Sequence, residues 1–124
     1  MLKTGITHES LLTVSASDTA AALGSGDMEV LATPALIALM ENAAMLCVAP
    51  YLAAGQTTVG SQIASTHLKP TPVGGTAKAK AELREIDGRK LVFDVSASDE
   101  QGSVGNGTHV RYIVDREKFM SRIK

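Results

Sequence analysis

The sequence predicts an α+β fold in which an antiparallel sheet of about five strands wraps around one long central helix. Residues 30–50, VLATPALIALMENAAMLCVAP, are almost entirely apolar, and a helix that is hydrophobic on nearly all sides must be covered by protein. Residues 57–115 contain four segments with strand character, separated by short turn signals. An antiparallel sheet that curls over the helix is the most economical way to bury it.

The elements before and including the helix follow from local signals. HESLLTVSA, residues 8–16, has weak strand character, and residues 17–29 are small and polar, which favours a loop or a short irregular helix. Thr33 fits a helix N-cap and Pro34 the first helical position. Pro50 disfavours helical backbone at the residue before it, so the helix should end near Ala49.

The second half of the chain alternates with the period of a strand. TTVGSQIASTHL, residues 57–68, reads as a strand that a Pro- and Gly-rich turn closes. Residues 76–86 and 89–98 alternate apolar and polar side chains, and Asp87-Gly88 between them is a strong hairpin signal. The expected inward faces are Ala77, Ala79, Ala81 and Leu83, then Leu91, Phe93, Val95 and Ala97.

A second turn and a final strand follow the alternating segments of residues 76–86 and 89–98. The turn is DEQG, the strand covers residues 103–115, and DREKFMSRIK should form a short polar helix or tail. The chain has 124 residues, which suits a single domain over residues 1–124. A domain of this size would gain stability from oligomerisation.

Composition excludes several function classes. The net charge is −1 and the 12 basic residues form no dense run, so nucleic acid and anionic membranes are poor partners. One cysteine cannot form an intrachain disulfide, and residues 1–20 lack a signal-peptide pattern, so we expect a cytoplasmic protein. Glu41 and Asn42, with Pro34 and Pro50, argue against a membrane span in the apolar segment.

Glu41 is the residue of the apolar segment that most needs an explanation. Its neighbours along the helix, such as Ile37 and Met45, leave almost no polar face. A buried unpaired carboxylate is costly, so such a group is usually paired or neutral. The plain alternative is an exposed or salt-bridged residue, but we expect Glu41 to act chemically at the water-reaching end of an apolar pocket.

Together with this element order, three polar positions resemble the fluoroacetyl-CoA thioesterase-like branch of the hotdog-fold acyl-CoA thioesterases. The branch has a Thr before the central helix, a Glu within it and a His on the following strand. Thr33 in LATP, Glu41 in LMEN and His67 in STHLKP fill these positions, at matching separations of eight and 26 residues. The resemblance covers essentially the whole chain and implies that these three residues are catalytic.

Two further positions resemble residues that line the acyl pocket in that branch. Gly60 in TVGSQ and Arg111 in HVRYIV match a glycine and an arginine on strands beside the pocket, which implies substrate binding. From the residues alone, Gly60 can equally mark a β-bulge, and Arg111 can pair with an acid on the sheet surface. The fluoroacetyl-specific enzymes close the pocket with phenylalanines before the helix, whereas AAALGSGDMEV, residues 20–30, has no aromatic side chain.

The resemblance implies hydrolysis of a small or medium acyl-CoA thioester to free acid and CoA. Thr33 can be an N-cap only, or its hydroxyl can attack or position a reactant. His67, with an ordinary pKa near 6.5, suits a proton shuttle. No metal or cofactor is expected beyond the CoA of the substrate. His109 is expected to be structural or peripheral, and Cys47 a small buried apolar residue.

Helix geometry separates two of the proposed catalytic residues. Eight residues of helix rise by about 12 Å, so Thr33 and Glu41 of one straight helix cannot touch. Either the helix starts well after Pro34 or the site combines residues of two subunits. Proteins with the resembled fold form dimers with sites at the interface, which favours a homodimer, and such dimers commonly pair again.

Two other functions stay open at this stage. A non-catalytic acyl-CoA binding module would leave the three polar residues unexplained. An enoyl-CoA hydratase of this fold would be expected to carry an Asp and a His five residues apart at the helix start. No such pair occurs here.

Overall fold

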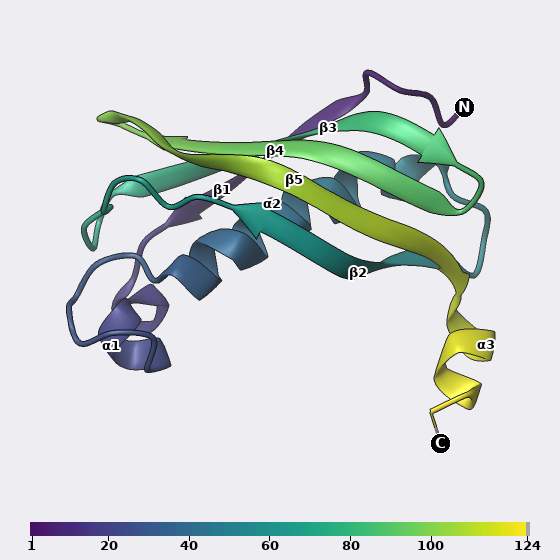
Figure 1. Ribbon diagram of the computed structural model, residues 1–124. Coiled ribbons are helices and arrows are strands. Elements are labelled where there is room, and N and C mark those ends of the chain that lie inside the picture. Colours follow the sequence, from purple (N-terminus) through teal and green to yellow (C-terminus); the bar gives the residue numbers. More distant parts are fainter. Residues whose placement is uncertain (124) are drawn as a thin grey trace.

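The computed structural model describes residues 1–123 and confirms the predicted architecture. One five-stranded antiparallel sheet, in the order β1-β3-β4-β5-β2, curls over the helix α2, as Figure 1 shows. The last residue of the predicted domain and of the predicted C-terminal segment, Lys124, lies outside the described residues. The strands are β1 (Thr7–Thr13), β2 (Gln56–Ser65), β3 (Thr76–Asp87), β4 (Lys90–Asp99) and β5 (Gly102–Asp115). The helical elements are η1 (Ala16–Asp18), α1 (Ala20–Leu23), α2 (Thr33–Val48), η2 (Ala49–Tyr51) and α3 (Arg116–Ser121).

The predicted N-cap of the central helix is wrong by one residue. Ala32 is the N-cap of α2 and Thr33 is already helical. The segment before α2 is fixed by backbone hydrogen bonds, since the Ala32 amide donates to the Asp18 carbonyl at 2.9 Å. The Ala32 carbonyl then accepts the first helical bond, from Leu36. The Thr33 side chain is therefore free to serve a purpose other than capping.

The other end of α2 lies where the sequence predicts it. The helix ends at Val48, and Pro50 lies in the 3₁₀ turn η2 that follows. Its 16 residues correspond to a length of about 24 Å.

The core lies between α2 and the concave face of the sheet. Both predicted inward faces are buried, the one on β3 and the one on β4. Three of the four β3 residues are alanines, whose small side chains let the helix approach the sheet closely. The residues of α2 in this core are Leu36, Leu39, Met40, Ala43, Ala44, Cys47 and Val48. Cys47 is buried as expected, and burial raises the pKa of its thiol.

Thr33–Tyr51 is long and apolar enough to cross a membrane by length and composition alone. One such helix is weak evidence, because the core helix of a soluble domain passes the same test. Here the helix packs mainly against β1 and β3, and Leu36 and Met40 are completely buried. This arrangement fits a core helix.

The predicted hairpin between β3 and β4 is present, but its turn lies one residue later than the Asp-Gly signal suggests. Asp87 pairs with Lys90, so Gly88 and Arg89 form the two-residue turn. Gly88 has a φ of 61°, and glycine at the first turn position suits the turn types that match the twist of paired strands. The turn thereby presents Arg89 at the end of the sheet.

A buried carboxylate anchors the loop that follows β2. The Asp99 side chain is 1% exposed and accepts hydrogen bonds from Lys69 Nζ at 2.6 Å and Thr71 Oγ1 at 2.7 Å. The backbone amide of Gln101 donates a third bond at 2.8 Å. Burial acts to raise the pKa of Asp99, but these three hydrogen bonds outweigh it and hold the pKa below its usual value. The loop carrying His67 is thus tied to the end of β4.

We expect Asp99→Asn to destabilise the fold by about 2–3 kcal/mol, because it removes the charge from hydrogen bonds to a buried carboxylate. A depressed carboxylate pKa contributes stability above the unfolded value of about 3.9, and this contribution is lost as pH falls through the folded pKa. The gap between wild type and variant in urea unfolding should therefore close in acid.

The matched control for this measurement is Asp94→Asn, which breaks the exposed ion pair between Arg84 and Asp94. An exposed pair contributes at most about 1 kcal/mol. Equal losses in the two variants at neutral pH would contradict the anchoring role of Asp99.

Candidate active site

Thr33 and His67 come together at the N-terminal end of α2. Thr33 Oγ1 lies 2.7 Å from His67 Nδ1. Thr33 is the first residue of the helix, and His67 follows the end of β2, where the chain turns toward Lys69. The Thr33 side chain is exposed while the imidazole behind it is half-buried. This is the relation of a hydroxyl to a base that can take its proton.

The surroundings of His67 favour its neutral form. Burial lowers the pKa of the imidazole, and the backbone of Lys69 offsets this only in part. His67 Nε2 is buried and has no hydrogen-bond partner within residues 1–123. A protonated ring would bury part of a positive charge with no ion-pair partner among residues 1–123, which is costly. A neutral ring can accept the Thr33 proton at Nδ1 when that nitrogen is the unprotonated one.

Glu41 lies elsewhere, in the middle of α2, and faces the strands β2 and β5. A Cβ atom added to Gly60 would lie 3.0 Å from Glu41 Oε2, 3.2 Å from His109 Cε1 and 3.3 Å from Arg111 Nη1. Three polar side chains therefore meet above the backbone of Gly60. Glu41 is half-buried and makes no hydrogen bond or ion pair with the described part of the chain. Its carboxylate is available to a ligand or a water molecule.

The structure confirms that Gly60 lies at a β-bulge, and its role in substrate binding stays a prediction. The register between β2 and β5 shifts between Gly60 and Gln62, which is a β-bulge. A Cβ at this position would make a tight contact with the Glu41 carboxylate, which would have to move by a few tenths of an ångström. A glycine in a strand often marks such a close approach.

Arg111 does not form the surface ion pair that was one of its two predicted roles. Its side chain is 6% exposed, and its Nε and Nη2 donate to Thr58 Oγ1 at 2.7 Å and to the Thr58 carbonyl at 2.9 Å. Nη1 lies 3.2 Å from His109 Nε2. Burial lowers the pKa of Arg111, and the negative charge of Glu41 opposes this change. The guanidinium is thus a fixed cation beside Glu41.

Of the two roles predicted for His109, structural or peripheral, the structure supports the structural one. The ring is 1% exposed, its Nδ1 lies 2.8 Å from the Gln62 carbonyl and its Nε2 faces Arg111. A carbonyl only accepts, so Nδ1 carries the proton and Nε2 accepts from Arg111. Burial, and after it the charge of Arg111, lowers the pKa of His109 and keeps the ring neutral. The available signal was the strand alternation, which puts residues 109 and 111 on one face.

One protomer therefore carries two separate groups of the predicted site residues. Thr33 and His67 are in contact at the start of α2, whereas Glu41, Gly60 and Arg111 converge near its middle. The helix begins at Thr33, so a late helix start does not bring Thr33 to Glu41. About 12 Å of helix separates the two groups. Within residues 1–123, no three His, Cys, Asp or Glu side chains are grouped to hold a metal ion.

Residues 14–117 match the family model of fluoroacetyl-CoA-specific thioesterases. The fluoroacetyl-CoA thioesterase of Streptantibioticus cattleyicolor is 42% identical over 96 residues, which cover 77% of this chain and 69% of that protein.

Solved structures agree with the match. The structure of a fluoroacetyl-CoA thioesterase superposes with a TM-score of 0.93 at 34% identity, covering 99% of this chain and 96% of that one. A thioesterase superfamily member from Thermus thermophilus has the same fold, with a TM-score of 0.91 at 22% identity over 99% and 91% of the two chains. The resemblance predicted from Thr33, Glu41 and His67 is confirmed at the level of the family. The chain belongs to the fluoroacetyl-CoA-specific thioesterase family, a branch of the hotdog-fold acyl-CoA thioester hydrolases.

Proposed function

We propose that this protein hydrolyses small or medium acyl-CoA thioesters to the free acid and CoA, with Thr33, Glu41 and His67 as the reacting groups. The observation that carries the assignment of residues is the 2.7 Å contact between Thr33 Oγ1 and His67 Nδ1 in a chain of this family. An exposed hydroxyl backed by a neutral imidazole suits acyl transfer. The reaction needs no cofactor besides the CoA of the substrate.

The start of α2 supplies the electrostatic part of the proposed site. The amides of the first helical turn have no partner within the helix and carry a partial positive charge. Pro34 has no N–H, so the amides of Thr33 and Ala35 are the ones that can face the thioester oxygen. Charge that develops on that oxygen in the transition state is then stabilised by fixed donors.

Proton transfer completes the reaction. Glu41 either removes a proton from the attacking water or attacks the carbonyl carbon itself to form an anhydride that water then hydrolyses. In both routes neutral His67 takes up the proton that the water gives up and delivers it to the departing thiolate. In both routes water and the thioester yield one acid and one thiol. Glu41 is suited to either role because its carboxylate has no partner among the described residues and lies beside the fixed Arg111 cation.

The proposed active form is a homodimer in which each site combines Thr33 and His67 of one protomer with Glu41 of the other. The strand β2 is at the edge of the sheet, and residues 60–62 at its centre are exposed. Ala38 and Leu46 on α2 are also exposed. An unpaired edge strand next to apolar helix surface suits pairing with a second copy.

The substrate range is proposed to be wider than fluoroacetyl-CoA. The segment of residues 20–30, which carries no aromatic side chain, forms α1 and an exposed loop. Leu23 and Met28, two large apolar side chains of this segment, are exposed and do not belong to the core. Nothing of aromatic size is therefore supplied by this segment to close a small acyl pocket.

Substitution of the reacting groups should abolish turnover without unfolding the protein. We expect Glu41→Gln and Thr33→Ala each to lower kcat/KM by about 10²–10⁴, the usual contribution of acid–base groups. Thr33→Ser keeps the hydroxyl and should retain far more activity. The assay is thiol release from a panel of acyl-CoAs that includes acetyl-, fluoroacetyl- and butyryl-CoA. Near-normal turnover in folded Glu41→Gln and Thr33→Ala proteins would refute these roles.

The rate should fall in acid as His67 becomes protonated. Burial lowers the pKa of His67, so the neutral form dominates at pH 7 and is lost only as pH falls through a value below about 6.5. We expect an acid limb in kcat/KM with its midpoint below that value, measured from initial rates. The limb should persist in the residual activity of Glu41→Gln and be absent in His67→Gln. A midpoint above pH 7 would contradict a neutral His67.

Mixing two inactive variants tests the two-subunit site. A dimer of one Thr33→Ala chain and one Glu41→Gln chain contains one intact composite site, so random mixing should restore about a quarter of wild-type activity. If each site lay within one chain, every site would carry a lesion and no activity would return. The matched control is the double variant mixed with wild type, for which a two-subunit site predicts inactive mixed dimers.

A further inference from the structure

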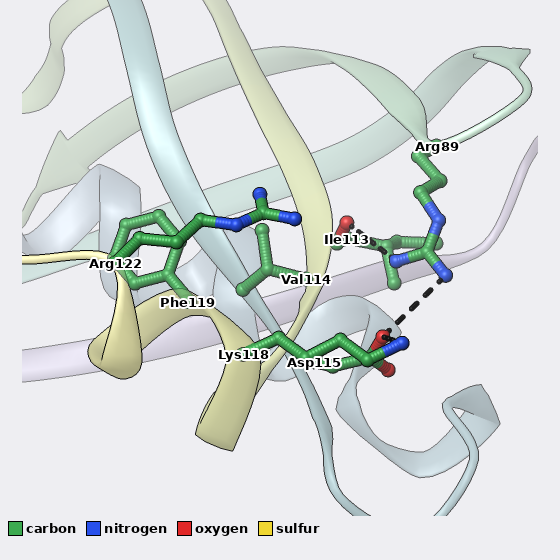
Figure 2. A pocket seen from close by; sticks show the side chains of 7 residues that line it. All are labelled: Arg89, Ile113, Val114, Asp115, Lys118, Phe119 and Arg122. Atoms are coloured by element: carbon green, nitrogen blue, oxygen red, sulfur yellow. Dashed lines mark hydrogen bonds and ion pairs between the residues drawn. The ribbon is translucent and has the colours of Figure 1, made fainter.

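The end of the sheet opposite His67 carries a basic pocket of about 350 Å³ that the proposed chemistry does not use. The turn between β3 and β4, the end of β5 and the helix α3 enclose it, as Figure 2 shows. Arg89, Lys118 and Arg122 approach it from different sides, and Asp115 is the acid within it. Its net charge is thus positive on a chain whose net charge is −1.

The cations of the pocket are only weakly neutralised. Arg89 and Lys118 each lie 3.9 Å from Asp115 Oδ2, which is beyond hydrogen-bond distance. Arg122 makes no ion pair with any residue in the described range 1–123. The three donors remain available to an anion with several oxygens, for which arginine is the preferred partner.

Arg89 is tied to β5 through both its side chain and its backbone. Its guanidinium donates to the Ile113 carbonyl at 3.1 Å, and its own carbonyl accepts from the Ile113 amide at 2.9 Å. The tight turn at Gly88 and Arg89 is therefore tied to β5. One wall of the pocket is preformed, which lowers the entropic cost of binding.

The pocket also has an apolar surface next to its charges. Phe119 is partly exposed, and Val114 and Ile113 lie beside it. An aromatic ring and aliphatic side chains suit a flat heterocycle, and cations at the rim suit phosphate. A phosphorylated adenosine combines these features in one ligand.

The pocket and the Glu41 group lie along the same two strands. Gln56 pairs with Asp115 at the pocket, and Gly60 pairs with Arg111 beside Glu41. Four residues of antiparallel strand separate them, a distance of about 14 Å. An extended pantetheine arm joins the nucleotide and the thioester of an acyl-CoA across such a separation.

We propose that the pocket formed by Arg89, Lys118, Phe119 and Arg122 binds the adenosine 3′,5′-bisphosphate portion of the acyl-CoA substrate. This inference rests on the proposed function, since the pocket would bind the nucleotide part of the acyl-CoA that the protein is proposed to hydrolyse. The nucleotide takes no part in the chemistry, so the pocket contributes to substrate affinity and to selection of CoA over shorter thioesters.

The test compares acyl-CoA with the matching acyl-pantetheine, which lacks the nucleotide. We expect Arg122→Glu to lower the ratio of kcat/KM for acyl-CoA to that for acyl-pantetheine by about tenfold or more, the loss of one charge-assisted contact. Arg84→Glu, on the exposed outer face of β3, is the matched control and should leave the ratio unchanged. An unchanged ratio in Arg122→Glu and in Lys118→Glu would overturn the proposal.

Direct binding separates failure of the pocket from failure of the proposed function. Calorimetry with adenosine 3′,5′-bisphosphate should show binding to wild type that Arg122→Glu weakens about tenfold and Arg84→Glu does not. This result without any thioester hydrolysis would retain the pocket and reject the hydrolase. Hydrolysis without nucleotide binding would do the reverse. If inorganic phosphate displaced the substrate as effectively as adenosine 3′,5′-bisphosphate at the same ionic strength, a nucleotide site would be rejected.

Discussion

The burial of α2 is the constraint on which the rest of the structure depends. The helix is apolar on most of its sides, and each buried Leu or Met contributes about 1.5–3 kcal/mol only if it is removed from water. The sheet satisfies this requirement by curling over the helix with alanine-rich β3 at the centre of the contact. Small side chains on the sheet and larger ones on the helix fill the space between them.

The same helix sets the geometry of the proposed chemistry. A rigid helix holds Thr33 and Glu41 at a fixed separation, and the first residue of the helix is the one whose hydroxyl meets His67. The loop that brings His67 back to the helix is held by the buried carboxylate Asp99 through Lys69 and Thr71. The contact of Thr33 with His67 at one end of α2 thus depends on a polar anchor that lies outside the proposed site.

The cluster under β2 and β5 shows how a cation can be buried beside a carboxylate. Burial removes hydrating water from Arg111, but its guanidinium gains hydrogen bonds to Thr58 and His109. His109 is in turn hydrogen-bonded to the Gln62 carbonyl at the bulge. The absence of a side chain at Gly60 leaves the space in which Glu41 and Arg111 approach each other. A buried polar group of this kind is tolerated because nearly all of its donors are satisfied. The bulge, the glycine and the two basic residues therefore form one unit.

The sequence by itself determined the order and faces of the elements, and it pointed to the family. Apolar content and strand alternation are local properties, so a helix from Pro34 to about Ala49, one residue from the observed bounds, and the inward faces of β3 and β4 could be predicted without any long-range contact. The spacing of Thr33, Glu41 and His67 carried the resemblance in the same way.

Only the tertiary structure decided which of these residues meet. The contact of Thr33 with His67 joins residues 34 apart, and the cluster of Glu41, Gly60, His109 and Arg111 joins α2, β2 and β5. His109 could not be distinguished from a solvent-edge histidine, because its burial is set by strands paired across the sheet. The N-cap was misplaced for a similar reason, since the bond from Ala32 to Asp18 comes from a distant turn. Local patterns fix elements, but a site consists of contacts between elements, and these depend on how the elements pack.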